Sequence, residues 1–125
     1  MNTRLIQFRA KHYETGQWIY GAYVPVTASH FPMIYTLDGD RHRVDENTVG
    51  QYAGMYDDKE QEIYEGDIVK YGNEKGIVVF DDGRFLCDDG GVHVEDLYVA
   101  YYGSPLNIIG NIHDNPELVV QEGGE

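Results

Sequence analysis

Two carboxylates, those of Glu65 and Asp67, flank Gly66 at a spacing that could support acid–base catalysis. Neighbouring carboxylates can divide the roles of general acid and general base. A glycine before a strand, however, also supplies a backbone angle that other residues rarely adopt, and a turn aspartate accepts backbone N–H bonds. We therefore interpret Gly66 and Asp67 as a structural turn and predict no catalytic residue. The alternative is an unrecognised enzyme with a site near Asp67 and His113.

Metal-ligating residues are present, but their spacing does not match a metal site. The five histidines are His12, His30, His42, His93 and His113. The single cysteine, Cys87, could meet His93 across a hairpin, but a zinc site needs further ligands. Asp81-Asp82-Gly83 and Asp88-Asp89-Gly90 lack the spacing of a calcium loop. We predict neither a metal site nor any other cofactor.

Tyrosine is abundant, with 11 tyrosines in 125 residues. This residue favours half-buried pleated surfaces, on which the ring packs and the hydroxyl stays in water. Small β-barrels bind peptides through exposed aromatic residues between their loops. We therefore predict a binding surface made of tyrosines in the second half of the chain. Its residues are Tyr64, Tyr71, Tyr98, Tyr101 and Tyr102.

The first 45 residues predict two successive β-hairpins, because short alternating segments are separated by turn residues. The expected strands span residues 5–10, 18–20, 33–37 and 41–44. Asp38-Gly39-Asp40 lies between the last two, and Asp-Gly between extended segments is a strong hairpin signal. The polar run Asp45-Glu46-Asn47 marks the best joint between two halves of the chain.

The second half predicts further short strands separated by glycine turns, with a helical turn near Pro116. The expected strands span residues 49–55, 67–71, 77–80, 84–87, 92–94, 97–102 and 107–112. Residues 77–80 are apolar on both faces, which favours a central position in a sheet. Strands at this spacing are typical of a sandwich or small barrel, so we expect a mostly β fold.

The charge excludes some partners. Nine basic and 22 acidic residues give a net charge of −13, whereas binding to nucleic acid or anionic membranes needs clustered basic residues. No apolar run reaches the about 20 residues of a membrane span, and none is typical of a signal peptide. We expect a cytoplasmic protein that binds neither nucleic acid nor membrane. An acidic decoy that acts on a nucleic-acid-binding host protein is an alternative function.

Three stretches, in the right order along the chain, resemble the YopX family of phage and prophage proteins. They are Gln7–Lys11 with Trp18; Gln51–Met55 with Asp57–Lys59 and Glu62–Val69; and Ile109–Leu118. They are similar to the family's FRAW-like opening, its QYTGL and EIYEGDIV core, and its closing IGNIYENPEL. Glu60-Gln61 stands where the family has Asn-Gly, so the turn there is expected to be reshaped. The resemblance implies a phage or mobile-element setting and an SH3-like barrel in the C-terminal half, without an established activity.

These observations together predict N-terminal β-hairpins (residues 1–48) packed on a C-terminal SH3-like β-barrel (residues 49–120), with little helix and a flexible tail (residues 121–125). The function that we expect is a non-enzymatic interaction module of phage or prophage origin in the cytoplasm of the host cell. It would bind a protein partner or, because exposed strand edges invite pairing, a second copy of itself.

Overall fold

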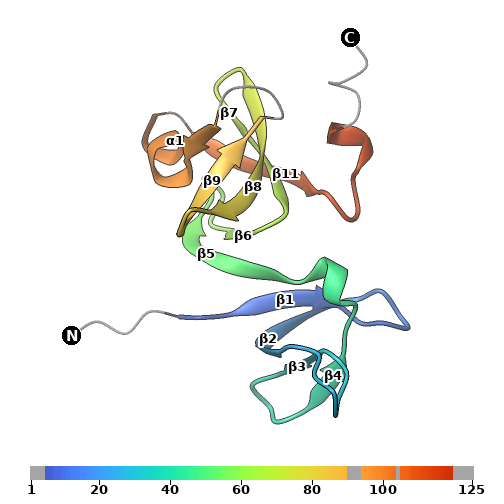
Figure 1. The fold of residues 1–125 in the computed structure, drawn as a ribbon. Helices are drawn as coiled ribbons and strands as arrows, with labels where there is room; N and C mark the ends of the chain where they lie inside the picture. The colour runs from blue at the N-terminus through green and yellow to red at the C-terminus, as the bar shows by residue number, and fades with distance from the viewer. Residues whose placement is uncertain (1–4, 90–93, 104, 120–125) are drawn as a thin grey trace, which may run out of the picture. The chain divides into compact units, whose positions relative to one another are not determined.

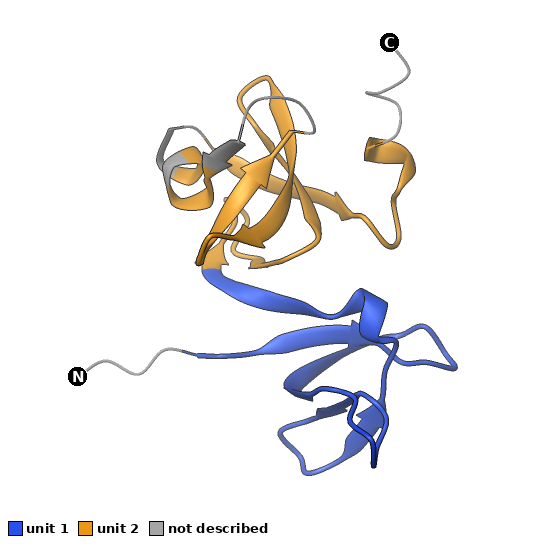
Figure 2. Ribbon diagram, viewed as in Figure 1, with its two compact units in different colours: residues 1–54 blue, residues 55–125 orange. Residues whose placement is uncertain are grey.

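The computed structural model describes residues 5–89, 94–103 and 105–119, apart from the side chains of residues 94–95, 99 and 102–103. The chain forms two compact units, residues 1–54 and residues 55–125, which Figure 2 shows in different colours. We call them unit 1 and unit 2. The fold is mostly β, as the sequence predicts, and it contains two antiparallel sheets (Figure 1). Among the described residues, no helix has the length and hydropathy that a membrane span needs.

Unit 1 is a curled antiparallel sheet whose strands follow one another in the order β4-β3-β2-β1-β5. Its elements are β1 (Phe8–Lys11), β2 (Trp18–Val24), β3 (Met33–Tyr35), β4 (Arg41–Arg43), the 3-10 helix η1 (Glu46–Thr48) and β5 (Gly50–Tyr56). β5 begins beside β1, with Gly50 opposite Arg9, and continues into unit 2.

Both hairpins predicted for the first 45 residues are confirmed. β1 pairs with β2, so that Lys11 lies opposite Trp18, and β3 pairs with β4, so that Tyr35 lies opposite Arg41. Gly39 has a φ of +95° in the turn between β3 and β4. This is the conformation for which the Asp-Gly sequence is suited, because glycine has no Cβ to oppose a positive φ.

The period of two along each strand separates the core of unit 1 from its outer surface. Ala10, Ile34 and Val44 form the buried core. Partly buried side chains pack against this core; they are Phe8, Ile19, Tyr23 and Val49. Because neighbouring strand residues point to opposite faces, the arginines of β1 and β4 lie on the face opposite to these core residues, where Arg9 is buried, Arg41 is exposed and Arg43 is half-buried.

The end of β4 returns to the end of β1, which curls the sheet of unit 1. His12 and Val44 form an antiparallel bridge, and the Tyr13 N–H donates to the Arg43 carbonyl at 3.2 Å. Just beyond the bridge, the Asp45 N–H donates to the Lys11 carbonyl at 2.8 Å. The loop after β1 is therefore fixed beside the last residue of β4.

Unit 2 contains a five-stranded antiparallel sheet in the order β10-β9-β8-β7-β11, and the short strand before it, β6, is the neighbour of β5 at the end of the first sheet. Its elements are β6 (Glu62–Tyr64), β7 (Asp67–Tyr71), β8 (Glu74–Asp81), β9 (Arg84–Asp88), β10 (Val94–Asp96), α1 (Leu97–Gly103) and β11 (Leu106–Asn111). The central position predicted for residues 77–80 is confirmed, since β8 lies between β7 and β9. In the described residues this sheet ends at β10 and β11 and does not close on itself.

The strand predicted over residues 97–102 is wrong, because this segment is the helix α1. Its tyrosines and valine favour a strand, yet tertiary packing overrides such propensities. Leu97 and Ala100 are both buried, and a spacing of three residues places them on one face of a helix. The Asp96 carboxylate also accepts the Tyr98 N–H at 2.9 Å, which satisfies a donor of the first helical turn.

The buried carboxylate of Asp57 joins the beginning of unit 2 to its last strand. One oxygen accepts the N–H groups of Lys59 at 2.9 Å and Gln61 at 2.8 Å, which shapes the turn before β6. The other oxygen accepts the Ile108 N–H of β11 at 3.1 Å. The next residue adds a main-chain bond, from the Asp58 N–H to the Leu106 carbonyl at 2.8 Å.

Replacing Asp57 by alanine is expected to reduce the free energy of unfolding by roughly 3 kcal/mol, because three N–H groups lose a charged acceptor. Urea titration followed by circular dichroism measures this change. Asp58→Ala is the matched control: its side chain is exposed, and its main-chain bond to Leu106 is kept. The control is expected to change stability by less than about 0.5 kcal/mol. Equal effects of the two substitutions would contradict the role given to Asp57.

Candidate functional site

Two of the five tyrosines predicted to form a binding surface belong to the core. Tyr64 is only 2% exposed and Tyr71 only 6%, so neither ring is available to a partner, and the prediction is corrected for both. β7 is buried on both faces over most of its length, which explains the position of Tyr71. The Tyr64 hydroxyl donates to the Glu62 carboxylate at 2.9 Å.

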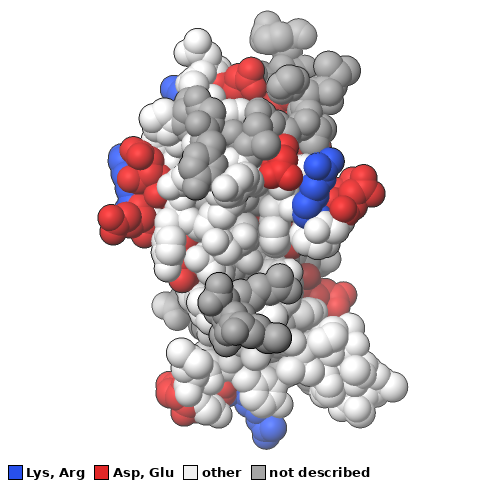
Figure 3. Space-filling view, turned by 90° about the vertical axis from the view of Figure 1, so that its left-hand side faces the viewer, with Lys and Arg blue, Asp and Glu red and all other residues white. Residues whose placement is uncertain are grey.

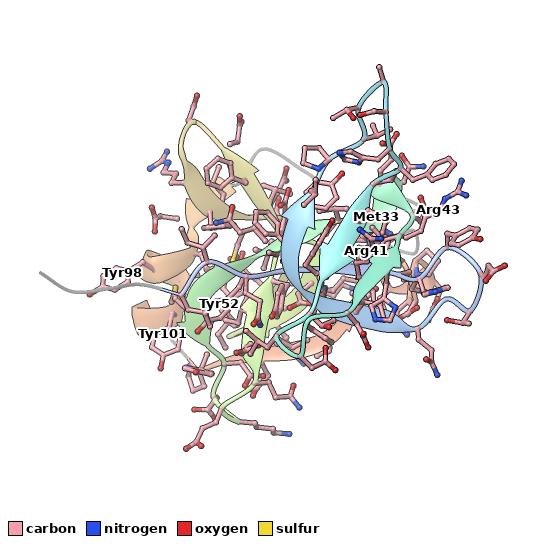
Figure 4. All side chains as sticks on the ribbon, turned by 90° about the horizontal axis from the view of Figure 1, so that it is seen from below. Met33, Arg41, Arg43, Tyr52, Tyr98 and Tyr101 are labelled. Carbon is pink, nitrogen blue, oxygen red and sulfur yellow. The ribbon has the colours of Figure 1, made fainter. Side chains whose placement is uncertain are left out.

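The other three tyrosines belong to α1. Tyr98 is 60% exposed, and Tyr101 is half-buried. Both project from the helix in Figure 4. The side chain of Tyr102 lies outside the described residues. Within the described part of unit 2, the predicted tyrosine surface is therefore reduced to α1, with Tyr98 as its exposed member.

The Glu65-Gly66-Asp67 turn is built from main-chain contacts. Gly66 has a φ of +96°, and the buried Asp67 carboxylate accepts the Tyr64 N–H at 2.8 Å. The Gly66 carbonyl accepts the Ile112 N–H at 2.9 Å, which brings the turn beside His113. The fold thus places Gly66, Asp67 and His113 in one neighbourhood. With 2% exposure, the Asp67 carboxylate is not accessible to a substrate in this conformation.

The candidate metal ligands do not converge in the described residues. Cys87 is fully buried. His93, its predicted neighbour across a hairpin, lies outside the described residues. Among the residues that the structure describes, no group of three or more histidine, cysteine or carboxylate side chains could hold a metal ion.

The charge is divided unequally between the units. Unit 1 contains five of the nine basic residues and five of the 22 acidic ones, so its formal net charge is zero. The other four basic and 17 acidic residues lie in unit 2, which therefore carries the whole net charge of −13. On the face shown in Figure 3, the acidic side chains form separate small groups, and several lie beside a basic side chain.

The most distinctive constellation outside the core surrounds Arg43, the last residue of β4. Its Cζ atom lies 3.6 Å from the centroid of the Phe31 ring and 4.2 Å from that of the Tyr13 ring. Two aromatic rings from different segments therefore lie against one guanidinium. Such cation–π contacts fix a guanidinium while its N–H edge remains open.

An open groove of about 350 Å³ borders this guanidinium, and we call it the Arg43 groove. Its lining residues are Tyr13, Val26, Pro32, Arg43, Val44, Asp45 and Glu46. Tyr13 is 47% exposed, and Phe31, which stacks on Arg43, is 54% exposed. Figure 4 shows Arg43 beside Met33, its partner in the register of β3 and β4. Four of the lining residues are apolar or aromatic and three are charged.

Three separate segments build the Arg43 groove. The hydrogen bond from Tyr13 to Arg43 holds the loop after β1, whose turn is completed by the Glu14 N–H donating to His12 Nδ1 at 3.1 Å. The Val44 N–H donates to the Pro32 carbonyl at 3.0 Å and fixes the loop before β3. The groove is therefore positioned by the curl of the sheet.

Sequence reasoning did not select Tyr13, Phe31 or Arg43. One signal was available, because the alternation in Arg41-His42-Arg43 places both arginines on the outer face of a predicted strand. The convergence of the three residues, by contrast, depends on the bridge between His12 and Val44, which a pattern of single strands does not predict.

The fold is that of a small, mostly β protein of two units. Residues 7–120 match the YopX protein family, so the chain belongs to this family, as its three motifs predict. The structure is similar to the crystal structure of protein EF1440 from Enterococcus faecalis, with a TM-score of 0.57 and 21% sequence identity. That similarity covers 94% of this chain and 99% of the other. No curated protein matches the sequence.

Replacing Arg43 by alanine is expected to reduce the free energy of unfolding by about 1 kcal/mol, because the cation–π contacts with two rings are lost. Arg41→Ala is the matched control: Arg41 is exposed on the same strand, and it makes no ring contact among the described residues. Urea titration of both variants measures the difference. A loss for Arg41→Ala as large as that for Arg43→Ala would argue against the stacked arrangement.

Proposed function

We propose that this YopX-family protein is a non-enzymatic interaction module that binds a partner protein through the Arg43 groove of unit 1. The arginine held by two exposed aromatic rings at the edge of a groove is the observation that carries this proposal. Tyrosine, phenylalanine and arginine are enriched at protein interfaces, and arginine and tyrosine are frequent among their energetic hot spots.

The division of charge favours unit 1 as the contacting unit. A surface with a strong net charge repels partners of the same sign, whereas unit 1 is neutral and presents apolar side chains around the groove. Val26, Tyr13 and Phe31 each expose about half of their surface there. The charge of unit 2 would then maintain solubility without opposing contact at unit 1.

We further infer that unit 2 is an open relative of the SH3-like barrel. Its first full strand, β7, pairs with both β8 and the last strand, β11, and a helix precedes β11. This order supports the inference. The family resemblance adds a phage or prophage setting and a site of action in the host cytoplasm, both of which belong to the proposal.

The concentration of acidic residues in unit 2 favours one second function, a decoy that attracts a basic, nucleic-acid-binding host protein. A decoy of this kind needs carboxylates in a continuous row, similar to the phosphates of a duplex. The separate acidic groups on the face of Figure 3 do not form such a row. We therefore rank the interaction through the Arg43 groove first.

Affinity capture from host-cell lysate, followed by mass spectrometry, tests the proposal. The double variant Tyr13→Ala/Phe31→Ala is expected to reduce recovery of a specific partner at least tenfold, which corresponds to about 1.4 kcal/mol of binding free energy. Leu37→Ala is the matched control, since Leu37 is fully exposed in unit 1 but does not line the groove. Circular dichroism shows whether each variant is folded.

A partner captured equally by wild type, the double variant and the control would place the interface elsewhere and overturn the role of the groove. Sedimentation velocity of the same three proteins examines self-association, because a second copy of the chain is also a protein partner. Dimers formed by wild type and Leu37→Ala but not by the double variant would identify the partner as the chain itself.

A further inference from the structure

We propose that the Arg43 groove captures the C-terminal carboxylate of a partner polypeptide that ends in an apolar residue. This inference rests on the proposed function and names the chemistry of its partner. Three features of the groove lead to it: the free N–H groups of the Arg43 guanidinium, the apolar surface of the groove, and the two carboxylates on the rim.

The guanidinium is held by two aromatic rings. Its Cζ atom lies 3.6 Å from the Phe31 ring centroid and 4.2 Å from that of Tyr13, so the rings restrict its position while its N–H groups stay available to a ligand. A planar fork of this kind binds a carboxylate with two parallel hydrogen bonds. The stacked rings also restrict the side chain before binding, which lowers the entropy cost of forming those bonds.

The described residues supply no acceptor for these N–H groups, because the Arg43 side chain forms no hydrogen bond or ion pair with any of them. Asp45 and Glu46 line the same groove without forming an ion pair with Arg43. Asp45 instead caps η1, where its Oδ1 accepts the Asn47 N–H at 3.0 Å. The half-buried positive charge is thus available to an anion from a ligand.

The rest of the groove selects the kind of anion. The exposed apolar surface of the groove comes from Val26 and the Tyr13 ring, since Pro32 and Val44 are buried, so a ligand gains most when its charge and an apolar group are close together. The rim carboxylates of Asp45 and Glu46 oppose any anion, and they oppose a ligand with several negative charges, such as a nucleic-acid backbone, most strongly. A chain terminus with an apolar last residue meets both conditions, since one residue then carries the carboxylate and the apolar side chain.

The test is a titration of ¹⁵N-labelled protein, followed by NMR, with the peptide acetyl-Val-Leu, which has a free terminal carboxylate. The expected result is saturable shifts of amides in residues 26–31 and 43–46. The amide form of the same peptide, which lacks the negative charge, is expected to bind at least tenfold more weakly. Equal binding of the two forms would overturn the proposal, as would the absence of any shift at residues 43–46.

Two variants and two further probes complete the test. Arg43→Gln is expected to weaken acetyl-Val-Leu binding at least tenfold, whereas Arg41→Gln, on the same strand outside the groove, is expected to leave it unchanged. The ¹⁵N spectra report whether both variants are folded. Tighter binding of acetyl-Glu-Leu-amide, in which a side chain carries the carboxylate, or of inorganic phosphate would overturn the assignment to a chain terminus.

These outcomes separate the inference from the proposed function. If a captured partner depends on Tyr13 and Phe31 while acetyl-Val-Leu and its amide bind equally, the groove is an interface but does not read a terminal carboxylate. If the peptide binds selectively and no partner depends on the groove, the carboxylate site stands and the protein-binding function fails.

Discussion

The carboxylate of Asp57 is the interaction on which the architecture of unit 2 depends. It is buried, and its three N–H donors come from the turn before β6 and from β11, which are distant in sequence. A buried carboxylate is stable only when its oxygens are well bonded, so the turn and the strand must form together. The same contacts occupy the outer edge of β11, which otherwise would be open to pairing with another chain. This part of unit 2 is thereby protected from nonspecific association.

In unit 1, the basic side chains of two strands lie against aromatic rings. In β1, Arg9 and Lys11 lie over the Trp18 ring, and in β4, Arg43 lies against two rings. The five acidic residues of unit 1 are instead in the turns and in η1. The Arg43 side chain, which forms no ion pair with a described residue, is held by its two rings and remains able to bind an anion.

Much of the fold could be predicted from the sequence, and the reasons are local. Asp38-Gly39 specifies its hairpin because the turn needs a positive φ, and the alternation in residues 5–10 predicts a strand that the structure has over Phe8–Lys11. The helix α1 was not predicted, because the sequence does not show that Leu97 and Ala100 are the two buried residues of this segment. Their helical spacing becomes informative only when the core that buries them is known. The Arg43 groove was not predicted from the sequence for a related reason. Its residues belong to three segments that meet only when the sheet curls, and no local pattern encodes that curvature.

The chain has one tryptophan and one cysteine, and they lie in different units. Trp18 lies in unit 1 with two cations over its ring, so its fluorescence responds to the loss of that arrangement. Cys87 is fully buried in unit 2, so its thiol reacts with reagents only when that unit opens. Each half of the molecule therefore contains its own spectroscopic or chemical reporter. Whether the two halves unfold as one cooperative body or as two can be followed in the unaltered protein, without an added label.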